Sequence, residues 1–137
     1  MFLSIDPHDG LAIYDQIVRQ VKFAVACGAL RQGELVPSVR ELARELALNP
    51  NTVARAYREL QSEAVLSPVR GTGLEVAEGA ERRCRGQRRE LIRARLRQVL
   101  AEAVQSQLEI DDLRSLVEQE LSAAEKRSTK RGEKQKV

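Results

Sequence analysis

A short polar stretch from Asn49 to Arg58 holds the side chains best suited to chemistry in this sequence. Asparagine, threonine and arginine are the residue types that bind base edges and phosphates in nucleic acids. They can act together only if one face of a helix presents them, and Asn51, Thr52 and Arg55 lie at suitable positions for this, as does Arg58. The stretch therefore indicates a binding surface for nucleic acid.

The residues around that stretch predict the helix that carries it. Asn49 is a strong N-cap residue, and Pro50 fits the first helical position, where no amide donor is needed. Apolar side chains then recur at helical spacing and form one stripe: Val53, Ala56, Tyr57, Leu60 and Ala64. If this stripe faces a core, the polar side chains project outward. The first turn, with its positive helix-dipole end, then favours phosphate.

A shorter helix precedes the polar stretch and shares a core with the helix that follows. Ser38 and Glu41 have the spacing of a capping box, in which each side chain accepts a hydrogen bond from the other residue's amide. The apolar stripe of this helix ends near Ala47, so only a tight turn separates the two helices, as in a helix-turn-helix. Arg40, at the second helical position, is placed to reach a phosphate beside the groove.

Other elements complete a small domain around these two helices. An earlier helix ends before Gly28, and its apolar stripe consists of Tyr14, Ile17, Val18, Val21, Ala24 and Val25. After the polar helix, residues 66–69 and 74–77 predict a β-hairpin. Arg70 lies at its tip, and Gly71 permits close approach to a sugar-phosphate backbone.

The C-terminal part carries two more amphipathic helices. Residues 79–87 have no apolar period and predict a linker. Residues 88–125 predict two helices separated by a break, and each helix has one apolar face that needs a partner surface. We therefore expect this region to dimerise the protein. Residues 126–137 predict a disordered basic tail.

The charges of the C-terminal part alternate along the chain. Residues 81–97 carry eight basic and two acidic side chains, whereas residues 101–125 carry one basic and seven acidic ones. Segments of opposite charge suggest an antiparallel pairing across the dimer interface that would set its register. Exposed ion pairs contribute little energy each, so this pairing is a hypothesis about register rather than stability.

Composition argues against several classes of function. Aromatic residues make up only 3% of the 137 residues, which disfavours a base-stacking platform for single strands. The only histidine, His8, has no cluster of ligands near it in the sequence, so we expect no enzyme activity, metal or cofactor. We expect Cys27 to be buried and Cys84 to be exposed. With no signal peptide or membrane span recognisable, the expected location is the cytoplasm.

Periodicity alone leaves two interpretations of the N-terminal domain open. Short amphipathic helices with surface arginines are common, so a three-helix domain without DNA binding has the same stripes. Residues 1–80 carry eight basic and ten acidic side chains, whereas surfaces that bind nucleic acid are usually basic. DNA binding therefore requires that the acidic side chains lie away from the binding face.

The order of motifs over residues 11–78 resembles the DNA-binding domain of GntR-family bacterial transcription regulators. The stretches that carry this resemblance are Ile13–Ile17, Gly33, Val36–Ala43, Asn49–Leu60 and Arg70–Gly73. The resemblance implies a winged helix-turn-helix that binds a palindromic operator as a dimer, usually as a repressor. By position it implies DNA contacts from Arg40, Asn49, Asn51, Thr52, Arg55, Arg70 and Gly71. Arg58 joins this set because it lies on the same predicted polar face.

Three places depart from the pattern of that family. Ala47 and Ala64 stand where glycine is usual, and Leu74-Glu75 replaces the usual Thr-Phe after the wing turn. If Ala47 adopts a left-handed conformation, the strain is about 1 kcal/mol. None of these changes touches the predicted recognition surface.

The C-terminal part is too short for the effector-binding or aminotransferase-like domains that most members of that family append. It is similar to the short helical tail of the YtrA subfamily, which mainly dimerises the protein. The expected fold is mainly α: a winged helix-turn-helix with a two-stranded wing over residues 1–78, the linker, and a two-helix C-terminal dimerisation tail.

We expect a sequence-specific transcription regulator, a repressor, whose partners are double-stranded DNA and a second copy of the chain. One alternative is a protein-interaction module built on a winged helix that does not bind DNA specifically. A further alternative is nonspecific DNA association through residues 126–137 alone. The sequence does not indicate whether an effector exists.

Overall fold

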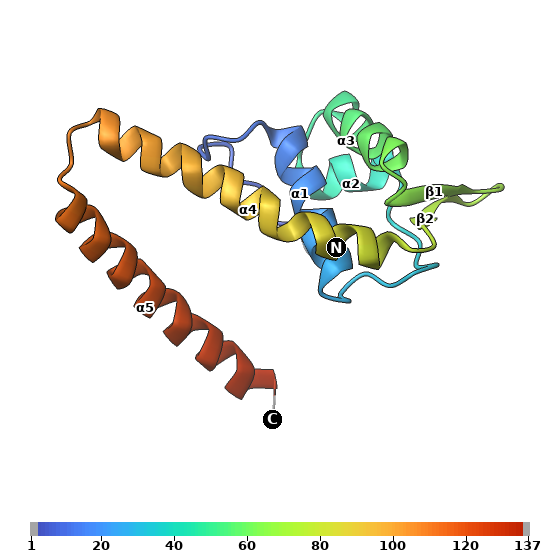
Figure 1. Cartoon of the computed structure of the whole chain (residues 1–137). Helices are drawn as coiled ribbons and strands as arrows, with labels where there is room; N and C mark the ends of the chain where they lie inside the picture. Colours follow the sequence, from blue (N-terminus) through green and yellow to red (C-terminus); the bar gives the residue numbers. More distant parts are fainter. Residues whose placement is uncertain (1–2, 136–137) are drawn as a thin grey trace. The chain divides into compact units, whose positions relative to one another are not determined.

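The computed structural model describes residues 3–135 of the 137-residue chain, with side chains up to residue 132. Its elements in chain order are α1 (Ile13–Ala26), α2 (Val39–Leu46), α3 (Pro50–Ser62), β1 (Leu66–Val69), β2 (Gly73–Val76), α4 (Ala80–Gln105) and α5 (Ile110–Gln135) (Figure 1). They confirm the mainly α fold with a two-stranded wing. The chain divides into two compact units, one ending at Ile92 and the other beginning at Arg93.

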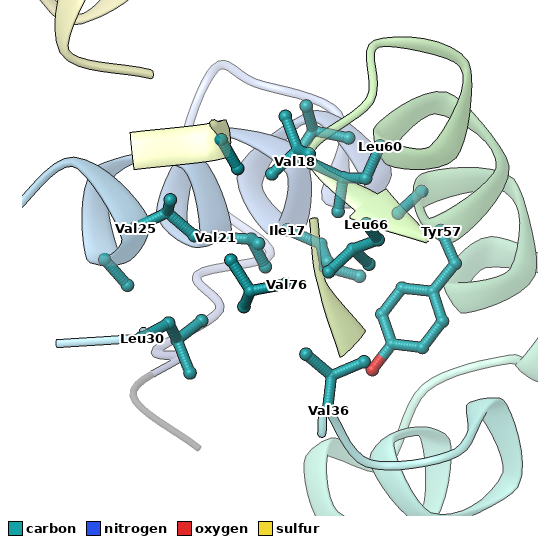
Figure 2. Close-up of a cluster of buried hydrophobic side chains, with 14 of the residues drawn as sticks. Ile17, Val18, Val21, Val25, Leu30, Val36, Tyr57, Leu60, Leu66 and Val76 are labelled. Carbon is teal, nitrogen blue, oxygen red and sulfur yellow. The ribbon is translucent and has the colours of Figure 1, made fainter. Parts of the chain in front are cut away.

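An aliphatic core holds the first unit together. Its fully buried side chains come from every element of the winged helix: Ile17, Val21 and Val25 of α1, Leu42 of α2, Val53 and Leu60 of α3, and Leu66 and Val76 of the hairpin. Figure 2 shows how α1, α3 and the hairpin converge on this cluster. Burying one such side chain stabilises the fold by about 1.5–3 kcal/mol. The predicted stripes therefore do form the core, except for Ala64, which is exposed and lies beyond the end of α3 in a left-handed conformation.

Two glutamines fasten the segment before α1, a role that periodicity does not predict. The buried Gln16 donates through Nε2 to the carbonyls of Asp6 at 2.7 Å and Leu11 at 3.0 Å. Its Oε1 accepts from the Asp6 amide at 2.9 Å. Gln20 accepts from the Ser4 amide and donates to the Ser4 carbonyl in the same manner. These bonds fix the start of α1 against the segment that precedes it.

The two helices of the helix-turn-helix begin at the predicted caps. The Glu41 amide donates to Ser38 Oγ at 3.1 Å, which is the first of the two hydrogen bonds expected of the capping box. Pro50 occupies the first turn of α3, and Asn49 is its N-cap. Between the helices, Ala47 has φ 54° and lies in the left-handed region, as its place in the turn implied.

The hairpin pairs antiparallel, with Leu66 opposite Val76 and Val69 opposite Gly73. Its second strand begins one residue earlier than predicted. The segment expected to be only a loop before α2 pairs with the other edge of β2. There the Val36 amide donates to the Leu74 carbonyl at 3.0 Å, and the Val76 amide donates to the Glu34 carbonyl at 2.9 Å. The wing is thus tied to the segment that leads into α2.

The predicted linker over residues 79–87 is wrong, because α4 begins at Ala80 and continues without a break to Gln105. Ala80 is fully buried in the core of the first unit. The Arg85 guanidinium donates to the Ala26 carbonyl at the end of α1, at 3.1 Å. Such docking needs only a few small buried side chains, so it leaves no apolar stripe for the sequence to reveal.

Both predictions about the cysteines are also wrong. Cys84 is 1% exposed, because the start of α4 turns it into the core, whereas Cys27 is exposed just after α1 ends. Burial raises the pKa of the Cys84 thiol, although the positive charges of Lys22 and Arg83 oppose that shift. The buried thiol is therefore protonated at neutral pH.

The second unit consists of the end of α4 and the whole of α5, separated by the predicted break. Gln107 takes a left-handed conformation in that break, with φ 64°. The tail predicted to be disordered is helical to Gln135, and residues 136–137 lie outside the described residues. Lysine, arginine and glutamate propagate a helix well, and this propensity outweighs the charge repulsion that favours disorder. None of the helices within residues 3–135 combines the length and the apolar character that a membrane-spanning segment needs.

Candidate nucleic-acid interface

α3 separates its side chains into a buried face and an exposed face. The buried face consists of Val53, Ala56, Tyr57 and Leu60. The opposite face carries the predicted site residues Asn51, Thr52, Arg55 and Arg58. Thr52 is half-buried and the other three are exposed. The structure therefore brings these four side chains onto one open helical surface.

Asn49 lies at the start of the same surface but is partly engaged by the helix itself. Its Oδ1 accepts a hydrogen bond from the Asn51 amide at 2.9 Å, so the side-chain oxygen satisfies one of the free amides of the first turn. The exposed side chain can offer its NH₂ group to a ligand while this cap stays in place. Asn49 therefore serves as a helix cap through its Oδ1, and its Nδ2 is the atom available to donate to a ligand.

Arg55 makes a contact that the sequence does not predict. Its guanidinium carbon lies 3.8 Å from the centroid of the Tyr14 ring, which is the geometry of a cation–π interaction. Tyr14 is half-buried on α1 and packs against the core. Its apolar periodicity placed it in the buried stripe, and no local pattern links two residues so distant in the sequence. Tyr14 is therefore a neighbour of the candidate site that the sequence does not reveal.

Arg40 is exposed in the first turn of α2, outside α3. The segment before it is attached to α3, since the Tyr57 hydroxyl donates to the Pro37 carbonyl at 2.7 Å. Burial raises the pKa of Tyr57, and the negative charges of Glu41 and Glu45 raise it further. The hydroxyl therefore keeps its proton, and this hydrogen bond persists across the ordinary range of pH.

The tip of the wing presents Arg70 and Gly71, both exposed. The turn closes with a hydrogen bond from the Thr72 amide to the Val69 carbonyl at 3.1 Å. Gly71 has φ +80°, and a Cβ built there meets nothing within 4 Å, so backbone conformation rather than crowding favours glycine. In Figure 1 the hairpin projects away from the helices. Arg70 and Gly71 thus form a second exposed element, separate from the face of α3.

This set of side chains is suited to binding rather than to bond-making chemistry. Arginine can form two parallel hydrogen bonds to guanine, and asparagine can form two to adenine. The arginines on α2 and at the wing tip are suited to phosphates. No group of three or more His, Cys, Asp and Glu side chains that could hold a metal ion occurs within the part of the chain that the structure describes.

Comparison with known protein families gives a match over residues 13–76, to the model described as bacterial regulatory proteins, gntR family. The chain is also similar to the HTH-type transcriptional repressor YtrA of Bacillus subtilis (strain 168). The two are 35% identical over 121 residues, which cover 88% of this chain and 92% of the relative. The similarity therefore extends beyond the winged helix into the C-terminal helices.

Solved structures of GntR-family regulators are also similar to this chain. A GntR family transcriptional regulator from Listeria monocytogenes is 31% identical, with a TM-score of 0.61, over 81% of this chain and 96% of that one. YtrA from Sulfolobus acidocaldarius, described as a GntR-family transcription factor, is 31% identical, with a TM-score of 0.55. That match covers 74% of this chain and 99% of the other.

Proposed function

We propose that this chain, which belongs to the GntR family of bacterial regulatory proteins, is a homodimeric repressor that binds a palindromic operator. The observation that carries this proposal is the division of α3 into a buried apolar face and an open polar one. A helix with this division can lie in the major groove while its other side stays packed on the domain.

The residues of the interface have different tasks in this proposal. Asn51 and Arg55, near the start of α3, read base edges, and Thr52 and Arg58 support them from the same face. Arg40 on α2 binds a phosphate beside the groove, and the NH₂ group of Asn49 reaches another. The wing places Arg70 and Gly71 against the sugar-phosphate backbone. Base contacts then supply specificity, and phosphate contacts supply affinity and orientation.

The second unit supplies the dimer interface. It exposes a series of large apolar side chains, of which Leu96, Val99, Leu116 and Leu121 are 45–53% exposed. They line a groove of about 560 Å³ between α4 and α5. A contiguous apolar surface of this kind marks a site of association. We propose a second copy as the occupant, because the basic segment, residues 81–97, and the acidic segment, residues 101–125, complement each other in charge.

Dimerisation matches the protein to the symmetry of its DNA. Two copies related by a twofold axis place two α3 helices about 34 Å apart, one turn of B-DNA, so the operator is a palindrome. The name of the Bacillus subtilis relative supports repression as the outcome. We place the protein in the cytoplasm, where the chromosome is accessible to it.

A gel shift with the DNA upstream of the protein's own gene tests this function. The duplex and a scrambled version of it are compared at two salt concentrations. We expect the native duplex to bind at least about 1,000-fold more tightly than the scrambled one. Equal affinity for both would overturn the proposal and favour a protein-interaction module. A variant without residues 126–137 serves as the control. Complete loss of binding in this variant would assign DNA association to residues 126–137.

A further inference from the structure

We infer that Tyr14 is a positioning residue for Arg55, whose guanidinium it holds in the orientation from which Arg55 contacts a base. This inference rests on the proposed function. If it holds, α1, which packs against α3, contributes to the recognition of DNA sequence.

The contact joins an exposed side chain to an anchored one. Arg55 is exposed, and its guanidinium carbon lies 3.8 Å from the centre of the Tyr14 ring. The ring itself is anchored, because Tyr14 packs against the core and the start of α1 is fastened by the hydrogen bonds of Gln16 to Asp6 and Leu11. The ring is therefore a rigid support for the arginine.

Stacking on the ring leaves Arg55 free to bind. A guanidinium is planar: one face can lie on an aromatic ring while its N–H groups point outward in the plane of the group. The two parallel hydrogen bonds that arginine makes to a guanine use this edge. The contact with Tyr14 and the contact with a base can thus exist together.

The support matters because a free arginine side chain loses rotamer freedom when it binds. Ordering such a side chain before binding lowers that loss and so increases affinity. Because Arg55 contacts a base, this increase in affinity is larger for the preferred DNA sequence than for random DNA. Arg58, an exposed arginine of the same face, is the natural comparison.

The test measures dissociation constants by fluorescence anisotropy for a palindromic duplex selected from a random pool and for its scrambled version. Tyr14→Leu removes the ring, and Tyr14→Phe keeps it without the hydroxyl. We expect Tyr14→Leu to weaken binding to the palindrome by about two- to fivefold, the range of an exposed cation–π contact. Tyr14→Phe should bind like the unaltered protein, and binding to scrambled DNA should change little.

A double-mutant cycle then shows whether the effect passes through Arg55. Tyr14→Leu should cause no further loss in an Arg55→Ala background but should keep its full effect in an Arg58→Ala background. An equal loss in both backgrounds, or a loss in Tyr14→Phe as large as in Tyr14→Leu, would overturn the inference.

A second measurement needs neither DNA nor a destabilising substitution. In the NMR spectrum of the free protein, the ring current of Tyr14 should shift the side-chain protons of Arg55 upfield, in Tyr14→Phe as well. Unshifted Arg55 protons would overturn the inference even if DNA binding is specific. Failure of the unaltered protein to prefer any palindrome would instead overturn the proposed function, so the two failures are distinguishable.

Discussion

The amide of Leu48 donates a 2.8 Å hydrogen bond to the carbonyl of Ala43, across the end of α2. The Ala47 amide bonds to the Arg44 carbonyl inside this loop, at 3.3 Å. Together they form a Schellman motif, which requires a left-handed residue at Ala47. This short closure fixes the direction in which the chain enters α3. The polar face of α3 is thus oriented by a strained alanine, at a position where glycine is favoured.

Ala47→Gly should stabilise the protein. Glycine adopts the left-handed conformation without steric strain, although it also gains entropy in the unfolded chain. We expect the free energy of unfolding to rise by about 0.5 kcal/mol, measured by urea denaturation. Ala64→Gly should behave alike, because Ala64 has φ 57° in the same motif after α3. Ala54→Gly, inside α3, is the control and should lower stability; a loss in Ala47→Gly would contradict the account.

Removal of residues 93–137 should leave a folded monomer with poor affinity for operator DNA. The cut belongs after Ile92 rather than at residue 88, because the start of α4 is part of the first unit and Arg19 donates to the Leu91 carbonyl at 3.3 Å. Sedimentation velocity measures the change in mass. Leu121→Glu in the full chain is a milder test and should also dissociate the dimer. A truncated protein that still sediments as a dimer would rule out residues 93–137 as the dimer interface.

The two thiols should differ strongly in reactivity. Cys27 is exposed, whereas burial excludes reagents from Cys84 and raises its pKa, so little of it is thiolate at neutral pH. An aromatic disulfide reagent at pH 7.5 should label one thiol quickly and the second only as fast as the protein opens. Cys27→Ser should remove the fast phase. If Cys84→Ser removed it instead, the packing of α4 on the core would be wrong.

Arg70→Ala should weaken binding to all DNA sequences by a similar factor. Its place at the tip of the wing assigns it to phosphate, which every sequence offers. Loss of one phosphate contact lowers the slope of log affinity against log salt by about 1. A titration of operator and scrambled duplexes over a range of salt measures both effects. Discrimination lost along with affinity would instead assign Arg70 to base recognition.

Much of the fold could be predicted because its signals are local. Ser38, Asn49 and Pro50 mark the starts of helices, and the apolar stripes mark the faces that pack. The polar face of α3 follows directly from its buried one. For this reason, all four predicted side chains of that helix share one surface.

The rest depends on contacts that leave no local pattern. Tyr14 and Arg55 meet only after α1 and α3 have packed, and Gln16 finds its partners only in the folded segment before it. The start of α4 docks through Ala80 and Cys84, two small residues in a run of arginines, so composition suggested a linker. In residues 126–135, charge favours disorder whereas helix propensity favours the observed helix, and the sequence does not rank the two effects.

The ratio of affinities for operator and scrambled DNA in Arg55→Ala and Asn51→Ala tests the central claim most directly. If these side chains read bases, each substitution should weaken operator binding by about 1 to 3 kcal/mol and leave binding to scrambled DNA nearly unchanged. The ratio of the two affinities then falls by about five- to 150-fold for each variant. An equal loss on both duplexes would contradict base reading by the open face of α3.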